Sequence, residues 1–141
     1  MRLPLRAATD ANAMPVVLDS WAVMRLLEGV EPAASRVQEV IDSGDAVMSW
    51  MNLGEILYIL RRSHGADAAS RTVNDIEGTV RVMLPDRQTV VDAATIKSTH
   101  SMSYADAFAA ATAMQLAAEL WTGDPELLVD DAPWHPFDPS A

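Results

Sequence analysis

Short apolar runs alternate along the chain with longer segments of helical periodicity, and this alternation is the strongest constraint on the fold. The short runs are residues 15–18 (PVVL), 46–50 (AVMSW), 89–91 (TVV) and 119–122 (ELWT). Each is too short for a helix and is typical of a buried strand. Because strands that alternate with helices build βαβ units, the sequence predicts an α/β fold with a mostly parallel sheet covered on both faces.

The helices are expected between these strands, over residues 20–29, 31–43, 52–64, 66–80, 92–99 and 104–116. Asn52 is expected to cap the third helix, since Asn52-Leu53-Gly54-Glu55 resembles a capping box. The last helix is so rich in alanine that other elements could pack closely against it. Residues 134–137 are a candidate edge segment of the sheet.

Size and composition limit the classes of protein. A chain of 141 residues, half of them hydrophobic, fits one globular domain with a buried core. Residues 1–13 show no periodicity and are expected to form a loose extension. No apolar run approaches the roughly 20 residues of a membrane-spanning helix, and the N-terminus lacks a signal-peptide apolar segment. The absence of cysteine excludes disulfides, thiolate zinc sites and cysteine nucleophiles. The simplest compartment is the cytoplasm.

The formal net charge of −10 argues against non-specific binding to nucleic acid. Two interpretations are compatible with it. The carboxylates could simply keep the surface soluble, or some of them could cluster around a cation. Composition does not separate these interpretations.

Four acids occupy related places in the predicted topology. Asp19 directly follows the first strand, and Asp124 follows the last clear strand by two residues. Glu55 and Asp106 lie in the first turns of helices. Each acid has a local explanation as a helix cap or turn residue. In open parallel sheets, however, ligand sites lie beyond the carboxyl ends of the strands, so all four acids would project toward the same rim.

Converging carboxylates repel one another unless cations lie between them. Mg²⁺ and Mn²⁺ prefer oxygen ligands, and two such ions roughly 3.5–4 Å apart can activate a water and stabilise the leaving oxygen of a phosphoryl displacement. The acids therefore indicate a candidate metal centre that needs no nucleophilic side chain.

Four motifs occur in an order and at a spacing typical of one protein family: VVLDSWAVM (residues 16–24), SWMNLGEIL (49–57), SYADAFAAATA (103–113) and WTGDPELL (121–128). They resemble the motifs of PIN-domain ribonucleases and, within that family, of the VapC toxins of bacterial toxin–antitoxin pairs. The resemblance covers about residues 14–138. It implies a PIN-like nuclease domain with a three-layer α/β/α sandwich around a parallel sheet.

The resemblance also implies a metal-dependent endoribonuclease in which Asp19, Glu55, Asp106 and Asp124 hold Mg²⁺ or Mn²⁺. Thr122 matches a hydroxyl position that supports these acids, and Glu126 is an alternative to Asp124 as the fourth ligand. The implied partners are an RNA substrate such as tRNA, a cognate antitoxin protein and a second copy of the chain in a homodimer. Two apolar stripes lie on helices, one formed by Trp21, Met24 and Leu27 and the other by Leu53, Leu57 and Leu60. An antitoxin would lie in a groove beside the first and the third to fourth helices, where part of these stripes is expected to be exposed.

Other functions stay open at this point. The chain could be a non-catalytic PIN-like binding or scaffold protein whose acids serve only as caps. A response-regulator receiver domain also binds Mg²⁺, but it needs an acidic neighbour that Asp19 lacks. The three histidines stand at no metal-ligand spacing. Four arginines are candidates for contacting RNA phosphates, or equally for lying on solvated helix faces: Arg25, Arg61, Arg62 and Arg71.

Overall fold

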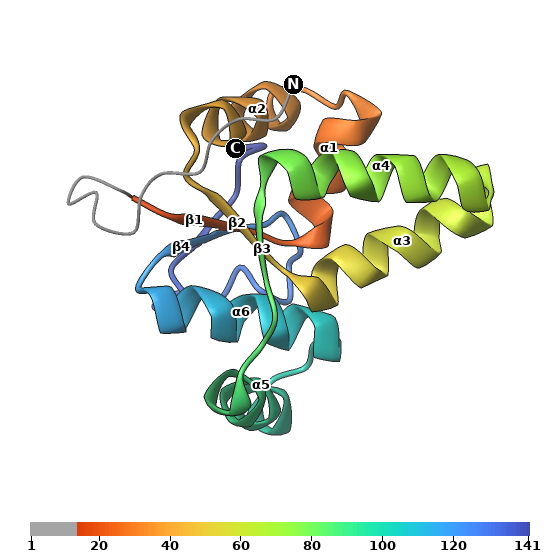
Figure 1. The fold of residues 1–141 in the computed structure, drawn as a ribbon. Helices are drawn as coiled ribbons and strands as arrows, with labels where there is room; N and C mark the ends of the chain where they lie inside the picture. Colours follow the sequence, from red (N-terminus) through yellow and green to blue (C-terminus); the bar gives the residue numbers. More distant parts are fainter. Residues whose placement is uncertain (1–13) are drawn as a thin grey trace.

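The structure is a computed structural model that describes residues 14–141; the expected N-terminal extension lies outside the described residues. Five parallel strands form one sheet in the order β3-β2-β1-β4-β5 (Figure 1). The strands are β1 (Val16–Leu18), β2 (Ala46–Ser49), β3 (Arg81–Met83), β4 (Glu119–Trp121) and β5 (Pro136–Phe137). The helices are α1 (Ser20–Glu28), α2 (Ala33–Ser43), α3 (Trp50–His64), α4 (Ala66–Thr79), α5 (Arg87–Thr99) and α6 (Tyr104–Leu116).

Helices cover both faces of the sheet, so the predicted three-layer α/β/α sandwich is confirmed. Alternate side chains of each strand enter different cores. Val17 and Val47 pack with α5 and α6, whereas Leu18 and Met48 pack with α1 to α4. In Figure 1, α5 and α6 accordingly lie on the opposite side of the sheet from α1, α2 and α4.

The order of the strands places a topological switch point at the centre of the sheet. The chain passes from β1 to β2 and β3 toward one edge, then returns to place β4 on the other side of β1. In open parallel sheets, ligands bind beyond the carboxyl ends of the strands at such a reversal. The ends of β1 and β4 are therefore the place to examine for a site.

Residues 89–91 do not form the predicted strand. They lie in α5, which begins earlier than expected because Asp86 caps it: Oδ1 of Asp86 accepts hydrogen bonds from the amide (2.9 Å) and hydroxyl (2.8 Å) of Thr89. The buried side chains Thr89, Ala93 and Ile96 then follow a helical spacing. The third strand is instead β3, an edge strand in which only Val82 and Met83 are partly buried.

The predicted cap at Asn52 is also wrong. Ser49 caps α3, and its hydroxyl accepts a hydrogen bond from the amide of Met51 at 3.2 Å. Asn52 is thus inside the helix, and Glu55 lies in the second turn rather than the first. The other helix boundaries agree with the predictions to within a few residues, and the candidate edge segment is β5.

None of the helices over residues 14–141 combines the length and the apolar character that crossing a membrane would require.

Candidate metal centre

Asp19 is the buried acid at the switch point. It directly follows β1 and is only 1% exposed. Its Oδ1 caps α1 by accepting a hydrogen bond from the amide of Ala22 at 2.9 Å, as the local interpretation predicts. Its carboxyl also accepts a hydrogen bond from the hydroxyl of Thr122, at the end of the neighbouring strand β4. The cap and the site are therefore the same carboxyl group.

Thr122 connects the two strands that meet at the switch point. It is fully buried. While its hydroxyl donates to Asp19, its Oγ1 accepts a hydrogen bond from the amide of Asp124 at 3.0 Å. Thr122 therefore places Asp124 relative to Asp19.

Asp106 and Asp124 form the acidic centre together with Glu126. Carboxylate oxygens of these three residues lie within 4.8 Å of one another. Asp106 is placed by the start of α6, where the hydroxyl of Ser103 accepts a hydrogen bond from its amide at 3.1 Å. Oδ1 of Asp124 accepts a hydrogen bond from the amide of Glu126 at 3.0 Å, which fixes the turn after β4. Both candidates for the fourth acid therefore reach the same place.

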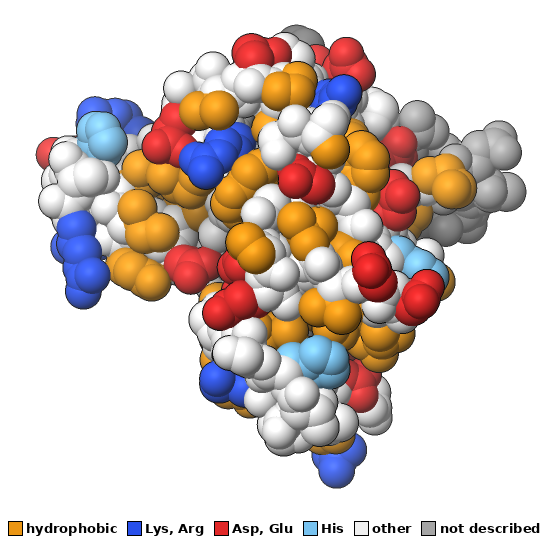
Figure 2. Space-filling model, turned by 180° about the vertical axis from the view of Figure 1, so that it is seen from behind, with side chains coloured by type: hydrophobic (Ala, Val, Ile, Leu, Met, Phe, Trp, Pro, Cys, Tyr) orange, Lys and Arg blue, Asp and Glu red, His pale blue; other side chains and the backbone are white. Residues whose placement is uncertain are grey.

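Glu55 reaches the site from α3. One of its carboxylate oxygens accepts a short hydrogen bond from the hydroxyl of Ser20 in α1. Glu55 lines a pocket of about 380 Å³ together with Asp106, Asp124 and Glu126. Seen from behind, acidic side chains gather where the α3–α4 hairpin meets the rest of the molecule (Figure 2).

Burial and mutual repulsion raise the pKa of two acids. The pKa of Asp19 rises from 3.8 to about 7, chiefly because burial penalises its charged form, although hydrogen bonds from Thr122 and Ala22 oppose the rise. The pKa of Asp106 rises to about 8, first through burial and then through the hydrogen bond and charge of Asp124. Two carboxyl groups can share a hydrogen bond only if one holds a proton. The site therefore retains protons that isolated carboxyl groups would have lost at the same pH.

A divalent cation fits this arrangement. The donor set is made only of carboxylate oxygens, which Mg²⁺ and Mn²⁺ prefer, and a bound cation would replace the proton that the acids otherwise share. Among the described residues, this is also the one group of three or more His, Asp or Glu side chains close enough to hold a metal ion.

Two residues hold the site together in ways that the sequence did not predict. Ser20 begins α1, and its hydroxyl donates hydrogen bonds to the carboxylate of Glu55 and to the carbonyl of Asn52 (3.1 Å). Asn52 is fully buried, and its Nδ2 donates to the carbonyl of Ala105 at 3.1 Å, next to Asp106. Polar residues on the buried faces of α1 and α3 were the available signal, since such groups need partners.

Comparison with known proteins decides the family. The family model described as PIN domain matches residues 16–130. The chain belongs to the PIN domain family. No curated protein sequence matches this PIN domain.

Solved structures share the fold of this PIN domain at low sequence identity. The DNA-bound VapBC from Salmonella typhimurium has a TM-score of 0.72 and 17% identity, and the match covers 89% of this chain and 98% of that one. VapBC-1 from nontypeable Haemophilus influenzae gives 0.71 and 20%, with 91% and 100% covered. VapC20 from Mycobacterium tuberculosis, described as a toxin that cleaves the sarcin-ricin loop, gives 0.65 and 19%, with 79% and 92% covered.

Proposed function

We propose that this PIN domain, residues 14–138, is a divalent-metal-dependent endoribonuclease that cleaves cytoplasmic RNA as the toxin of a toxin–antitoxin pair. The observation that carries the proposal is the convergence of Asp19, Asp106 and Asp124 at the switch point. Glu55 completes the set from α3. The fold shared with VapBC structures and with a sarcin-ricin loop cleaving toxin supports the choice of RNA and of a toxin.

The side chains of the site fall into proposed metal ligands and residues that position them. Asp19, Glu55, Asp106 and Asp124 would hold Mg²⁺ or Mn²⁺, with Glu126 beside Asp124 as an alternative ligand. A bound divalent ion lowers the pKa of water and offsets the charge that develops during in-line displacement at phosphorus. Thr122 keeps the Asp19 carboxyl group and the backbone of Asp124 in place, and Ser20 holds the Glu55 carboxylate. The carboxylates must be deprotonated to act, so ion binding and proton release are linked.

Cleavage of total cellular RNA tests the nuclease. Purified protein is compared in Mg²⁺, Mn²⁺ and EDTA with the Asp106→Asn variant. We expect metal-dependent cleavage by the unchanged protein and a loss of at least about 100-fold in the variant, because a metal ligand is removed. Asp92→Asn on α5 is the matched control, since Asp92 only bonds the side chain of Gln88.

The test also separates the alternative function. A non-catalytic binding or scaffold protein would leave RNA intact under every condition, and calorimetry would detect no binding of divalent ions. Cleavage that persists unchanged in Asp106→Asn would mean that a contaminating nuclease is responsible and would remove the support for the site.

The antitoxin is proposed to cover two apolar hollows beside α1. The first, of about 700 Å³, lies between α1, α3 and α4 and is lined in part by Met24, Leu27, Ile59 and Leu60. Leu27 is 41% exposed, as expected if a partner normally covers the stripe. Figure 2 shows basic side chains at the end of the α3–α4 hairpin and hydrophobic ones between that end and the body.

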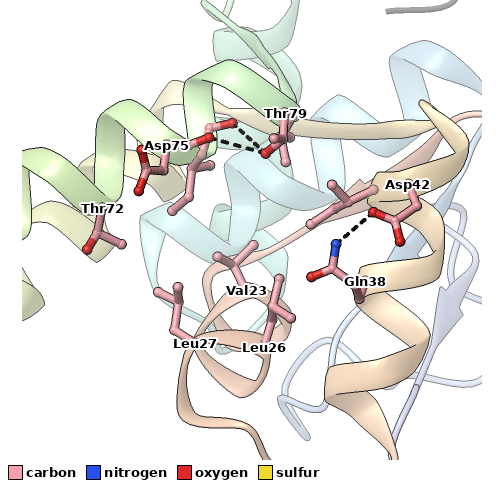
Figure 3. A pocket seen from close by; sticks show the side chains of 11 residues that line it. Val23, Leu26, Leu27, Gln38, Asp42, Thr72, Asp75 and Thr79 are labelled. Carbon is pink, nitrogen blue, oxygen red and sulfur yellow. Dashed lines mark hydrogen bonds between the residues drawn. The ribbon is translucent and has the colours of Figure 1, made fainter. Parts of the chain in front are cut away.

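The second hollow gives the partner's chemistry. It is about 450 Å³ in volume and lies between α1, α2 and α4. Val23, Leu26 and Leu27 form its apolar side, and the carboxylates of Asp42 and Asp75 stand at its border (Figure 3). A segment that presents apolar side chains flanked by Lys or Arg would match both features.

Co-expression with a candidate antitoxin protein tests this partner. We expect Leu27→Glu to reduce co-purification at least tenfold while RNA cleavage is retained, because a charge would be buried in the apolar groove. Val90→Glu on α5, at a similar exposure of 39%, should not. Light scattering of the purified chain tests the proposed homodimer; a monomeric mass across micromolar concentrations would contradict it.

A further inference from the structure

An RNA-cleaving site built from carboxylates needs a positively charged side chain that contacts the RNA backbone. The chain carries a net charge of −10, and bulk charge therefore repels a polyanion. Ten residues line the acidic pocket: Ser20, Trp21, Met24, Arg25, Glu55, Ile59, Ser103, Asp106, Asp124 and Glu126. Among these lining residues, Arg25 is the one that carries a positive charge.

Trp21 lies directly against the turn that carries Asp124. A β-carbon at Gly123 would stand 2.1 Å from Cζ2 of Trp21, far inside van der Waals contact. The indole ring therefore occupies the space that any other residue at position 123 would need. Since Gly123 lies between Thr122 and Asp124, the ring lies against this turn and lines the acidic pocket.

Arg25 lies on that ring one helical turn later. Its guanidinium carbon is 4.8 Å from the centroid of the Trp21 ring, a cation–π distance. One guanidinium nitrogen pairs with Oε1 of Glu28 at 3.1 Å. A guanidinium has five N–H donors, so the others stay available for a phosphate.

We infer that Arg25 binds the RNA backbone beside the scissile phosphate, and that Trp21, seated on Gly123, is the positioning residue for its guanidinium. This inference rests on the proposed function, because it names the residue through which the acidic site holds its substrate. Of the four arginines considered from the sequence, Arg61, Arg62 and Arg71 do not line this pocket.

Arg62 provides a matched control. Its guanidinium also lies over an aromatic ring, that of Tyr58 at 5.3 Å, but near the end of α3 and outside the acidic pocket. Arg25→Gln and Arg62→Gln therefore remove the same charge from the same kind of contact. A difference between them reports the place of the charge and not its loss.

Binding of a fluorescein-labelled single-stranded RNA, followed by anisotropy with Ca²⁺ in place of Mg²⁺, is the first measurement. Arg25→Gln should weaken binding about tenfold, the loss expected for one charge-assisted contact. The slope of log K against log [salt] should decrease in magnitude by about 0.7, the value for one phosphate contact on a single strand. Arg62→Gln should change the affinity less than twofold. Equal effects of the two variants would overturn the inference.

Three further variants test the positioning role. Glu28→Gln frees the guanidinium and should tighten RNA binding, whereas a purely structural ion pair would only lower stability. Trp21→Ala should reproduce the Arg25→Gln loss and its smaller salt slope, and Trp21→Phe should restore most of both. If Trp21→Ala lowers affinity without changing the salt slope, Trp21 does not act through Arg25.

Cleavage kinetics keep the two proposals apart. If RNA is cleaved, Arg25→Gln should raise KM with little change in kcat, since the contact is made equally in the bound substrate and the transition state. If the protein binds RNA through Arg25 but cleaves none, the nuclease proposal fails and Arg25 stands only as a contact to the RNA backbone. If the protein cleaves RNA and Arg25→Gln behaves like Arg62→Gln, the nuclease proposal stands and the Arg25 assignment fails.

Discussion

At the scale of single residues, Asn52 connects three helices through its hydrogen bonds. Its Nδ2 bonds Ala105 at the start of α6, and its carbonyl bonds Ser20 at the start of α1. It therefore joins the three helices from which Asp19, Glu55 and Asp106 reach the site. Over residues 14–141, its Oδ1 is a buried acceptor without a hydrogen-bond partner. Position 52 thus favours an amide donor, not the cap role that the sequence pattern suggested.

Replacing Asn52 by Asp tests that role. The change keeps the size of the side chain but removes the donor to Ala105 and can add a buried charge near the acidic site. We expect the free energy of unfolding to fall by about 1–3 kcal/mol, because the hydrogen bond to Ala105 is lost and a buried carboxyl group replaces the amide. Urea unfolding measures it. Asn74→Asp on the exposed face of α4 is the control and should stay within about 0.5 kcal/mol of the unchanged protein.

At the scale of elements, the alanine-rich helix α6 sets how closely the layers approach. Ala107, Ala109, Ala110, Ala111 and Ala113 are all fully buried. The helix contacts β1, β2 and β4 on one side and α3 and α5 on others. Its residues thus face packed neighbours nearly all round, which explains why small side chains are needed and why Asp106 is brought so near the strands.

Ala110→Leu should therefore destabilise the protein. Three added carbons have no space between α6 and its neighbours, and overpacking of this kind costs about 1–3 kcal/mol. A lower urea midpoint with an unchanged slope is the expected result. Ala94→Leu on the exposed face of α5 adds the same atoms to a helix surface and should be nearly neutral; an equal loss in both variants would contradict the packing argument.

The sequence predicts a strand at residues 89–91 and none at residues 81–83, and the structure shows the reverse. A β-branched run at 89–91 favours a strand, but the Asp86 cap and the buried spacing of Thr89, Ala93 and Ile96 favour a helix, and the helix buries more. The strand β3 has only three residues at the edge of the sheet. Its pairing with β2 comes from the tertiary fold, since so short a segment has little periodicity of its own.

At the scale of the whole molecule, the raised pKa values of Asp19 and Asp106 link stability to pH. In the unfolded chain both acids ionise near 3.8, but in the folded protein they hold their protons to about 7 and about 8. The folded state therefore binds more protons between these values, and the free energy of unfolding falls as pH rises through that window.

We therefore expect the metal-free protein to have a higher urea midpoint at about pH 5 than at about pH 9. Asp106→Asn cannot ionise, so it should reduce this difference and be more stable than the unchanged protein at the higher pH. Unfolding followed by circular dichroism in EDTA measures both. A variant whose midpoint falls at every pH would show that Asp106 supports the fold, against this account.

Divalent ions should oppose this loss of stability at high pH. A ligand that binds only the folded state stabilises it by about 1.4 kcal/mol at ten times its Kd. Because protons compete for the same oxygens, Mg²⁺ should raise the unfolding midpoint more at about pH 8 than at about pH 5. A pH-independent effect, or the same effect in Asp106→Asn, would mean that the ion binds elsewhere.

The sequence by itself determined the layout of most helices and strands, the α/β class, and the four acids as candidates. These depend on short-range properties: periodicity, helix caps and the residues that follow strands. The family motifs added the three-layer fold. Both kinds of signal involve residues that are close together in the chain, so the sequence alone reveals them.

Only the tertiary structure decided which groups meet. The order β3-β2-β1-β4-β5 places Thr122 beside Asp19, although they are far apart in the chain. The same packing places the Trp21 ring against Gly123 and the side chain of Asn52 beside the carbonyl of Ala105. The order of strands and the packing of side chains are set by burial of the whole core, which no local pattern contains.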